Sequence, residues 1–201
     1  MPLKLLSPGG GSVLLQANTT SLDYTLTVPA QTGNIFTTTS NLTSTTFTGA
    51  LPYGNMPTGS ILQVIQNSTS TAVVSTSLSY VDTNLSGTIT PKYSTSKILV
   101  MVSQQCYWSH SSANGLGINL LRGSTTLHES IADATGPFES YSSATNLYMR
   151  HNLTYLDSPA STSALTYKTQ IRPYSAGTVA AQNSAAVTPG KSYIILMEIA
   201  G

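Results

Sequence analysis

The sequence predicts an all-β protein, with an extended N-terminal β arm followed by an antiparallel, jelly-roll-like β-sandwich. Three observations support this fold class. Helical periodicity is nearly absent, and short segments of alternating apolar and polar residues recur between turn signals. The length of 201 residues suits one large all-β domain, or one compact domain with an extension. Roughly eight to ten strands at this spacing are typical of a sandwich and favour a jelly roll.

Residues 1–58 form the predicted arm, which is rich in Thr, Ser, Gly, Asn and Pro and has only short apolar runs. Fixing the backbone costs about 1–2 kcal/mol per residue. Each buried Leu, Val or Ile returns only about 1.5–3 kcal/mol. We therefore expect the arm to be ordered by other copies of the chain or by a larger assembly.

Two strands are expected in the arm, Ser12–Ala17 and Leu22–Val28, with a turn over Asn18–Ser21 between them. A return through Asn34–Phe36 follows Pro29 and Gly33. Proline and glycine then cluster just before the composition shifts toward Val, Ile and Leu, at Pro52, Gly54, Pro57 and Gly59. This shift places a domain boundary between the arm, residues 1–58, and a β-sandwich head, residues 59–201.

Ten segments of the head are candidates for these strands. They are Ile61–Asn67, Ala72–Ser75, Leu78–Asp82, Gly87–Thr90, Lys97–Tyr107, Gly115–Arg122, Thr126–Ala132, Asn146–Leu156, Ala164–Arg172 and Ser192–Ile199. Ala164–Arg172 alternates cleanly, with Leu165, Tyr167, Thr169 and Ile171 facing one way. The first half of Lys97–Tyr107 and the whole of Ser192–Ile199 are instead apolar on both faces. That pattern indicates burial from two sides, as between a sandwich core and a neighbouring subunit.

Composition excludes several classes of protein. Charged residues make up 7% of the chain, against about 25% in ordinary globular proteins. The formal charge of +1, with scattered basic residues, argues against nucleic-acid binding. So low a charge favours self-association. No apolar run is long enough for membrane insertion, and residues 1–15 make a poor signal peptide, so assembly inside a cell is expected.

Catalytic and metal chemistry find little support in the sequence. His110, His128 and His151 are not at ligand spacing, and the seven acids are dispersed. We interpret His151 as a packed or interface histidine, the alternative being a ligand or a pH sensor. Cys106 precedes His110 by four residues and is interpreted as a small buried hydrophobe rather than a thiol nucleophile. One thiol also excludes an internal disulfide framework.

One group of residues is a candidate for binding. Aromatic residues and a histidine flank two loops rich in Ser, Asn and Gly, at Tyr107, Trp108, His110, Phe138 and Tyr141. Exposed aromatic rings beside amides suit contact with a sugar or a protein receptor, because stacking and hydrogen bonding are both possible. The alternative is that Trp108 and its neighbours plug the end of the sandwich or a trimer axis.

Two segments carry a resemblance to a known family. The segment Gly11–Thr38, GSVLLQANTTSLDYTLTVPAQTGNIFTT, resembles one common in tailed-bacteriophage virion proteins, including tail and head fibres. The closing segment Lys191–Gly201, KSYIILMEIAG, is similar to the trimeric jelly-roll heads of such proteins, which are built like the C1q and tumour-necrosis-factor sandwiches. The resemblance implies a homotrimer, a virion location, synthesis in the host bacterial cytoplasm, no enzymatic activity and no cofactor.

A short arm with a globular head, and no predicted shaft, favours a capsid decoration (cement) or head-fibre protein. The arm is then expected to add strands to exposed edges of capsid or tail proteins. The residues expected to make these attachment strands are Val13, Leu15, Leu22, Tyr24, Leu26 and Val28. The alternative within the family is a tail-fibre tip that recognises host surface glycan. A cellular C1q-like or lectin-like module is a third possibility.

Overall fold

A computed structural model describes residues 3–6, 12–15, 53–109, 114–130, 140–142, 146–182 and 190–201. The chain divides into two units, Met1–Thr48 and Gly49–Gly201. The predicted boundary between residues 58 and 59 stays a prediction.

In the first unit, the described residues form two short antiparallel strands, β1 (Leu3–Leu6) and β2 (Ser12–Leu15). Their register places Leu3 opposite Leu15 and Leu5 opposite Val13. Strand β2 confirms the first part of the predicted strand Ser12–Ala17. Its partner β1 was not predicted from the sequence, because four residues are too few for alternation to be recognised. The predicted strand Leu22–Val28, with Leu22, Tyr24, Leu26 and Val28, lies outside the described residues.

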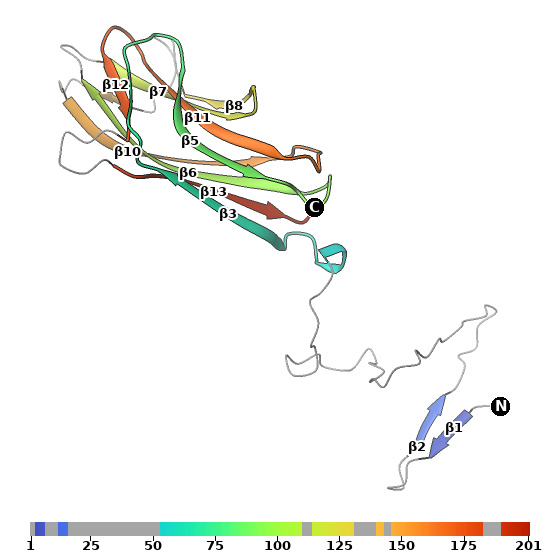
Figure 1. Cartoon of the computed structure of the whole chain (residues 1–201). Coiled ribbons are helices and arrows are strands. Elements are labelled where there is room, and N and C mark those ends of the chain that lie inside the picture. The colour runs from blue at the N-terminus through green and yellow to red at the C-terminus, as the bar shows by residue number, and fades with distance from the viewer. Residues whose placement is uncertain are drawn as a thin grey trace. The chain divides into compact units, whose positions relative to one another are not determined.

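The second unit is an antiparallel β-sandwich, which confirms the predicted fold class (Figure 1). One sheet, here the β6 sheet, holds β3 (Ile61–Thr69), β4 (Val73–Ser75), β6 (Lys97–Ser109), β10 (Asn146–Asp157), β12 (Thr178–Ala181) and β13 (Ser192–Ile199). The other, the β11 sheet, holds β5 (Val81–Ile89), β7 (Asn114–Arg122), β8 (Thr125–Glu129), β9 (Ser140–Ser142) and β11 (Leu165–Pro173). A 3-10 helix, η1 (Tyr53–Asn55), precedes β3.

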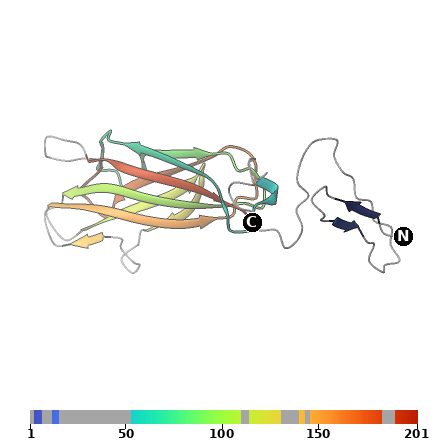
Figure 2. The same cartoon turned by 90° about the horizontal axis from the view of Figure 1, so that it is seen from below.

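The strand order is that of a jelly roll. The long strands of the unit, in chain order, are β3, β5, β6, β7, β8, β10, β11 and β13. In the β6 sheet the neighbours are β3, β13, β6 and β10, which are the first, eighth, third and sixth of these strands. In the β11 sheet they are β5, β11, β7 and β8, which are the second, seventh, fourth and fifth. Figure 2 shows β3, β13, β6 and β10 side by side. Because β3 and β13 are neighbours, Gly59 N–H donates to the Ala200 carbonyl at 2.8 Å, and the start and end of the sandwich meet.

Most predicted strands are present, with boundaries that differ by at most three residues. The segments Leu78–Asp82 and Gly87–Thr90 are an exception, because they belong to one continuous strand, β5. Asn84 adopts a positive φ of 60° within it, opposite a register shift in β11. Burial alternates throughout β5, but two of its buried positions are Thr83 and Gly87, so the apolar alternation that sequence reading relies on is missing there. Strands β9 and β12 were not predicted, since they are only three and four residues long.

A polar layer divides the core into two apolar clusters. Along β6, Ile98, Val100 and Val102 belong to one cluster and Cys106 and Trp108 to the other, with buried Gln104 between them. Strand β11 repeats the pattern, since Tyr167 lies in the first cluster, Ile171 in the second, and Thr169 between. The prediction that Tyr167, Thr169 and Ile171 face the same way is therefore confirmed, and the side that they face is the core.

Hydrogen bonds satisfy this polar layer. Thr169 Oγ1 donates to Gln104 Oε1 at 2.7 Å and lies 2.5 Å from Thr83 Oγ1. The Gln182 amide is oriented so that its oxygen and its nitrogen both have partners. Its oxygen accepts from Gln104 Nε2 at 3.3 Å, and its nitrogen donates to the Thr83 carbonyl at 3.1 Å. These bonds join β5 and β11 to β6, so the layer links the two sheets and sets their register.

A buried carboxylate also ties the sheets together. Asp157, at the end of β10, accepts a hydrogen bond from Arg122 Nη1 at 2.6 Å and from the Tyr167 hydroxyl at 2.7 Å. Burial raises the pKa of Tyr167, and its hydrogen bond to Asp157 raises it further. Burial alone would lower the pKa of Arg122, but the hydrogen bond and charge of Asp157 outweigh it and raise that pKa.

Candidate functional site

The outer face of the β6 sheet is the main candidate site. Strand β6 turns Ile98, Val100 and Val102 into the core, so Leu99 and Met101 face away from it. Strand β13 does the same, with Ile194 and Leu196 inside and Ile195 and Met197 outside. This arrangement agrees with the predicted two-sided apolar pattern.

Cross-strand register assembles these outer side chains into rows. One row is Leu156, Leu99, Met197 and Val64, and the next is Thr154, Met101, Ile195 and Gln66. We call the six apolar members of these rows, Val64, Leu99, Met101, Leu156, Ile195 and Met197, the apolar band. Val64 is 54% exposed, Leu156 50% and Met101 38%. Single exposed apolar residues need no explanation, but a contiguous band of them marks an interaction surface.

A hollow lies at the edge of the band. It has a volume of about 250 Å³ and is lined chiefly by Met101, Ser103, Asn152, Thr154, Tyr193 and Ile195. The small side chain of Ser103 forms its floor, since Ser103 pairs with Asn152 on one side and Tyr193 on the other. Beyond this row, Arg150 donates from Nη2 to the Lys191 carbonyl at 3.0 Å and from Nη1 to Ser103 at 3.3 Å.

The predicted aromatic group is divided by the structure. Trp108 is 3% exposed and packs in the second apolar cluster, so it is a core residue and not a contact residue, as the alternative interpretation held. Tyr107 lies on the outer face. His110 and Phe138 lie outside the described residues, and Tyr141 is described only as part of β9.

Tyr107 has an aromatic partner, Tyr148, that was not in the predicted group. Its ring lies 4.6 Å from that of Tyr148, centroid to centroid, and its hydroxyl donates to Asn146 Oδ1 at 2.8 Å. Tyr148 is 49% exposed. Sequence reasoning missed Tyr148. Tyr148 lies between Leu147 and Met149 in the predicted strand Asn146–Leu156, so the alternation of the strand points it to the other face from theirs, which is the outer face. Exposed stacked rings beside an amide are a second candidate binding surface.

The two residues considered for reactivity are both buried. Burial raises the pKa of Cys106 to about 12, although the charge of Arg150 opposes the rise, so the thiol stays protonated at neutral pH. This agrees with its interpretation as a small hydrophobe. His151 is buried, with Nε2 3.0 Å from Met149 Sδ, which agrees with a packed histidine. In the described part of the chain, no three His, Cys, Asp or Glu residues are grouped to hold a metal.

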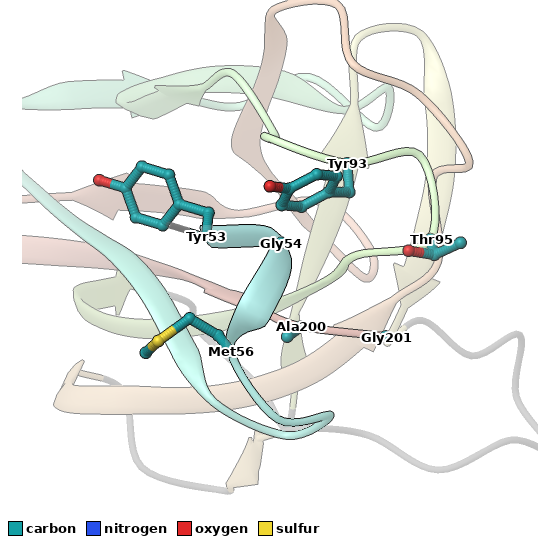
Figure 3. A pocket seen from close by; sticks show the side chains of 7 residues that line it. All are labelled: Tyr53, Gly54, Met56, Tyr93, Thr95, Ala200 and Gly201. Atoms are coloured by element: carbon teal, nitrogen blue, oxygen red, sulfur yellow. The ribbon is translucent and has the colours of Figure 1, made fainter. Parts of the chain in front are cut away.

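A second cavity lies where the sandwich begins and ends. Figure 3 shows Tyr53, Gly54 and Met56 from the segment around η1, Tyr93 and Thr95 from the turn before β6, and the closing Ala200 and Gly201. Its volume is about 170 Å³. Lys92 Nζ lies 5.6 Å from the centre of the Tyr53 ring. The first described residues of the second unit therefore line this cavity together with its last residues. Over the described ranges, no helix is long and apolar enough to span a membrane.

Comparison with known proteins finds no matching protein family and no matching curated sequence. Three solved structures that match are from infectious bursal disease virus: the Gx strain, T=1 particles derived from the virus, and the Gt strain. Their identities are 14%, 14% and 15%, with TM-scores of 0.35, 0.32 and 0.32 over 69%, 69% and 94% of this chain. This chain spans 38%, 36% and 46% of those chains. With scores so low, the likeness carries no argument about function.

Proposed function

We propose that this chain is a non-enzymatic structural protein of a tailed-bacteriophage virion. In this proposal it is a homotrimeric capsid decoration (cement) or head-fibre protein, with the jelly-roll head for trimerisation and display and the N-terminal arm for attachment. The observation that carries the proposal is the apolar band on the outer face of the β6 sheet. The core on the inner face is complete without these side chains, so the band is available for association.

The arm supports the attachment part of the proposal. An isolated two-stranded hairpin such as β1 and β2 is at best marginally stable in water, so it gains from a partner sheet. Adding Val13 and Leu15 as a strand to an edge of a capsid or tail protein would supply that partner. Three arms on one trimer would act together and turn weak single attachments into a stable one.

The proposal of a non-enzymatic role rests on the family resemblance and on the burial of the candidate reactive groups. Cys106 is a protonated, fully buried thiol, and His151 packs beside Met149. Neither side chain is accessible to a substrate, as a catalytic nucleophile or base must be. Synthesis in the host bacterial cytoplasm and a location on the virion complete the proposal, again from the resemblance.

A second candidate function is supported by one observation. The exposed Tyr148 ring, stacked with Tyr107 beside Asn146, offers the stacking and hydrogen bonding that a sugar ring requires. This favours a tail-fibre tip that binds host surface glycan. Adsorption of the purified full chain to host cells, lost in Tyr148→Ala and kept in Leu78→Ala, would support this candidate over the capsid role.

Co-sedimentation with virus particles tests the proposed function. Particles assembled without this chain should bind the purified full chain and carry it through a density gradient. The double variant Val13→Asp, Leu15→Asp should lose this binding, because charged side chains disfavour strand addition at an apolar edge. A wild-type chain that stays at the top of the gradient with capsids and with tails would contradict the virion role.

A further inference from the structure

We propose that the apolar band and the hollow at Ser103 form the contact between copies of this chain, with an apolar side chain of a second copy seated in the hollow. This inference rests on the homo-oligomer in the proposed function. It adds the surface through which the copies associate and the socket that fixes their register.

The extent of the band matches part of an interface between folded subunits. Its three most exposed members, Val64, Met101 and Leu156, present roughly 250 Å², and the partly buried Leu99, Ile195 and Met197 add to this, so the band approaches the ~300–600 Å² of the largest patch on a typical monomer. A stable interface takes about 800 Å² from each partner. The band therefore corresponds to the apolar centre of such an interface, and the polar rows beside it correspond to its rim.

The chemistry of the rim favours a second copy as the occupant. Gln66, Thr154, Ser103 and Asn152 border the band with amide and hydroxyl groups. Each of these groups both donates and accepts hydrogen bonds, so it can pair with an identical group on another copy. The three rows that hold the band and the hollow contain no charged side chain. Arg150, in the next row, already donates to its own chain. Two further cations lie at the border: Lys191 Nζ is 5.7 Å from the centre of the Tyr193 ring, and Lys97 pairs with Ile199 in the row beyond Leu99. The three uncharged rows can therefore meet a second copy without burying like charges, while the cations stay at the rim.

The hollow favours a protein side chain over a small molecule. Its volume of about 250 Å³ is below the ~300–1,000 Å³ of small-molecule pockets. Met101, Tyr193 and Ile195 make most of its wall apolar. Val64 and Leu156 project from the same face and are half exposed, so one face carries both a socket and the apolar side chains that could enter it. A surface of that kind can pair with a copy of itself.

Mass measurements on the full chain provide the first test. The wild type should sediment and scatter light as an oligomer, and Val64→Lys and Met101→Lys should raise the dissociation constant at least tenfold. Leu78→Lys is the matched control, because Leu78 is 55% exposed in the bend between β4 and β5, outside the band. It should leave the mass unchanged. Circular dichroism of each variant checks that the fold is kept.

Filling the hollow provides the second test. Ser103→Phe adds apolar surface to the face, so on a simple hydrophobic patch it would leave association unchanged or strengthen it. On a socket it should block the incoming side chain and weaken association at least tenfold. Ser103→Ala is the matched control, because it also removes the hydroxyl that accepts a hydrogen bond from Arg150 but does not fill the hollow. This variant should associate as the wild type does.

The outcomes separate this inference from the proposed function. A single-chain wild type, an oligomer that persists in both Lys variants, or a Ser103→Phe variant that associates normally would each overturn the inference. If the wild type is a single chain in solution but still co-sediments with virus particles, the virion role is supported and the proposed interface is wrong. An oligomer that responds to the variants as expected but binds no particle would support the interface and contradict the virion role.

Discussion

Removing the buried carboxylate of Asp157 should destabilise the sandwich more than any exposed acid does. Asp157 receives hydrogen bonds from Arg122 at 2.6 Å and Tyr167 at 2.7 Å, and its side chain is 7% exposed. Breaking a buried ion pair by removing one partner costs about 3–5 kcal/mol. The Arg122 side chain is 24% exposed, so water recovers part of that cost. For Asp157→Asn we therefore expect a loss of about 2–3 kcal/mol in the free energy of unfolding.

Urea denaturation at fixed protein concentration measures this loss, because association would otherwise change the apparent stability. With slopes of about 1–3 kcal/mol per molar urea, the midpoint should fall by roughly 1–2 M. Tyr167→Phe removes one of the two hydrogen bonds and should cost less, about 1–2 kcal/mol. In the double variant the two losses should not add, because both remove the same bond.

Asp82→Asn is the matched control for this experiment. Asp82 also accepts a 2.8 Å hydrogen bond from a cation, Lys168, but its side chain is 52% exposed. Burial alone would raise the pKa of Asp82, but the hydrogen bonds from Lys168 and Gln170 outweigh it and lower that pKa. Exposed pairs contribute only about 0–1 kcal/mol. If Asp157→Asn costs no more than Asp82→Asn, the argument that Asp157 ties the sheets together is wrong.

Three further predictions concern single positions. Folding raises the pKa of Cys106 from 9.0 to about 12. The protonated thiol therefore contributes fully to stability below pH 9, and this contribution is lost as the pH rises toward 12. Between these pH values, the free energy of unfolding of Cys106→Ala should fall less steeply with pH than that of the wild type. Gln104→Ala should cost about 2–4 kcal/mol in urea melts, because it leaves the buried hydroxyl of Thr169 without its acceptor; a loss under 1 kcal/mol would contradict a structural role for the polar layer. Gly123→Ala should cost about 1 kcal/mol by thermal unfolding and Gly123→Asn less, because the glycine has a φ of 58° with open space around it.

Much of the head could be predicted because the signal lies within single strands. In β6 and β13 most of the residues that face the core are apolar, and β11 alternates without interruption, so these strands were expected with nearly correct bounds. The strand β5 was divided in two because Thr83 and Gly87 occupy positions that face the core, so its alternation in burial is not an alternation of apolar and polar residues. The short strands β9 and β12 have no periodicity of their own, since they form only by pairing with β7 and β6.

The candidate site was harder to predict, because it depends on which strands are neighbours. Trp108 and Tyr107 are adjacent in sequence, yet the pleat sends one into the core and the other to the outer face. Tyr148 joins Tyr107 only because β10 pairs with β6 in this register. An aromatic cluster in the sequence therefore did not correspond to a cluster in space.

The amino-acid sequence by itself determined the all-β class, the apolar outer sides of β6 and β13, and the burial of Cys106 and His151. These properties follow from the two-residue period of a strand and from composition, which are local. The tertiary structure alone decided that Leu156, Leu99, Met197 and Val64 lie in one row, and that Ser103 leaves a hollow beside them. Such rows join residues more than a hundred positions apart, and only the long-range pairing of strands brings them together.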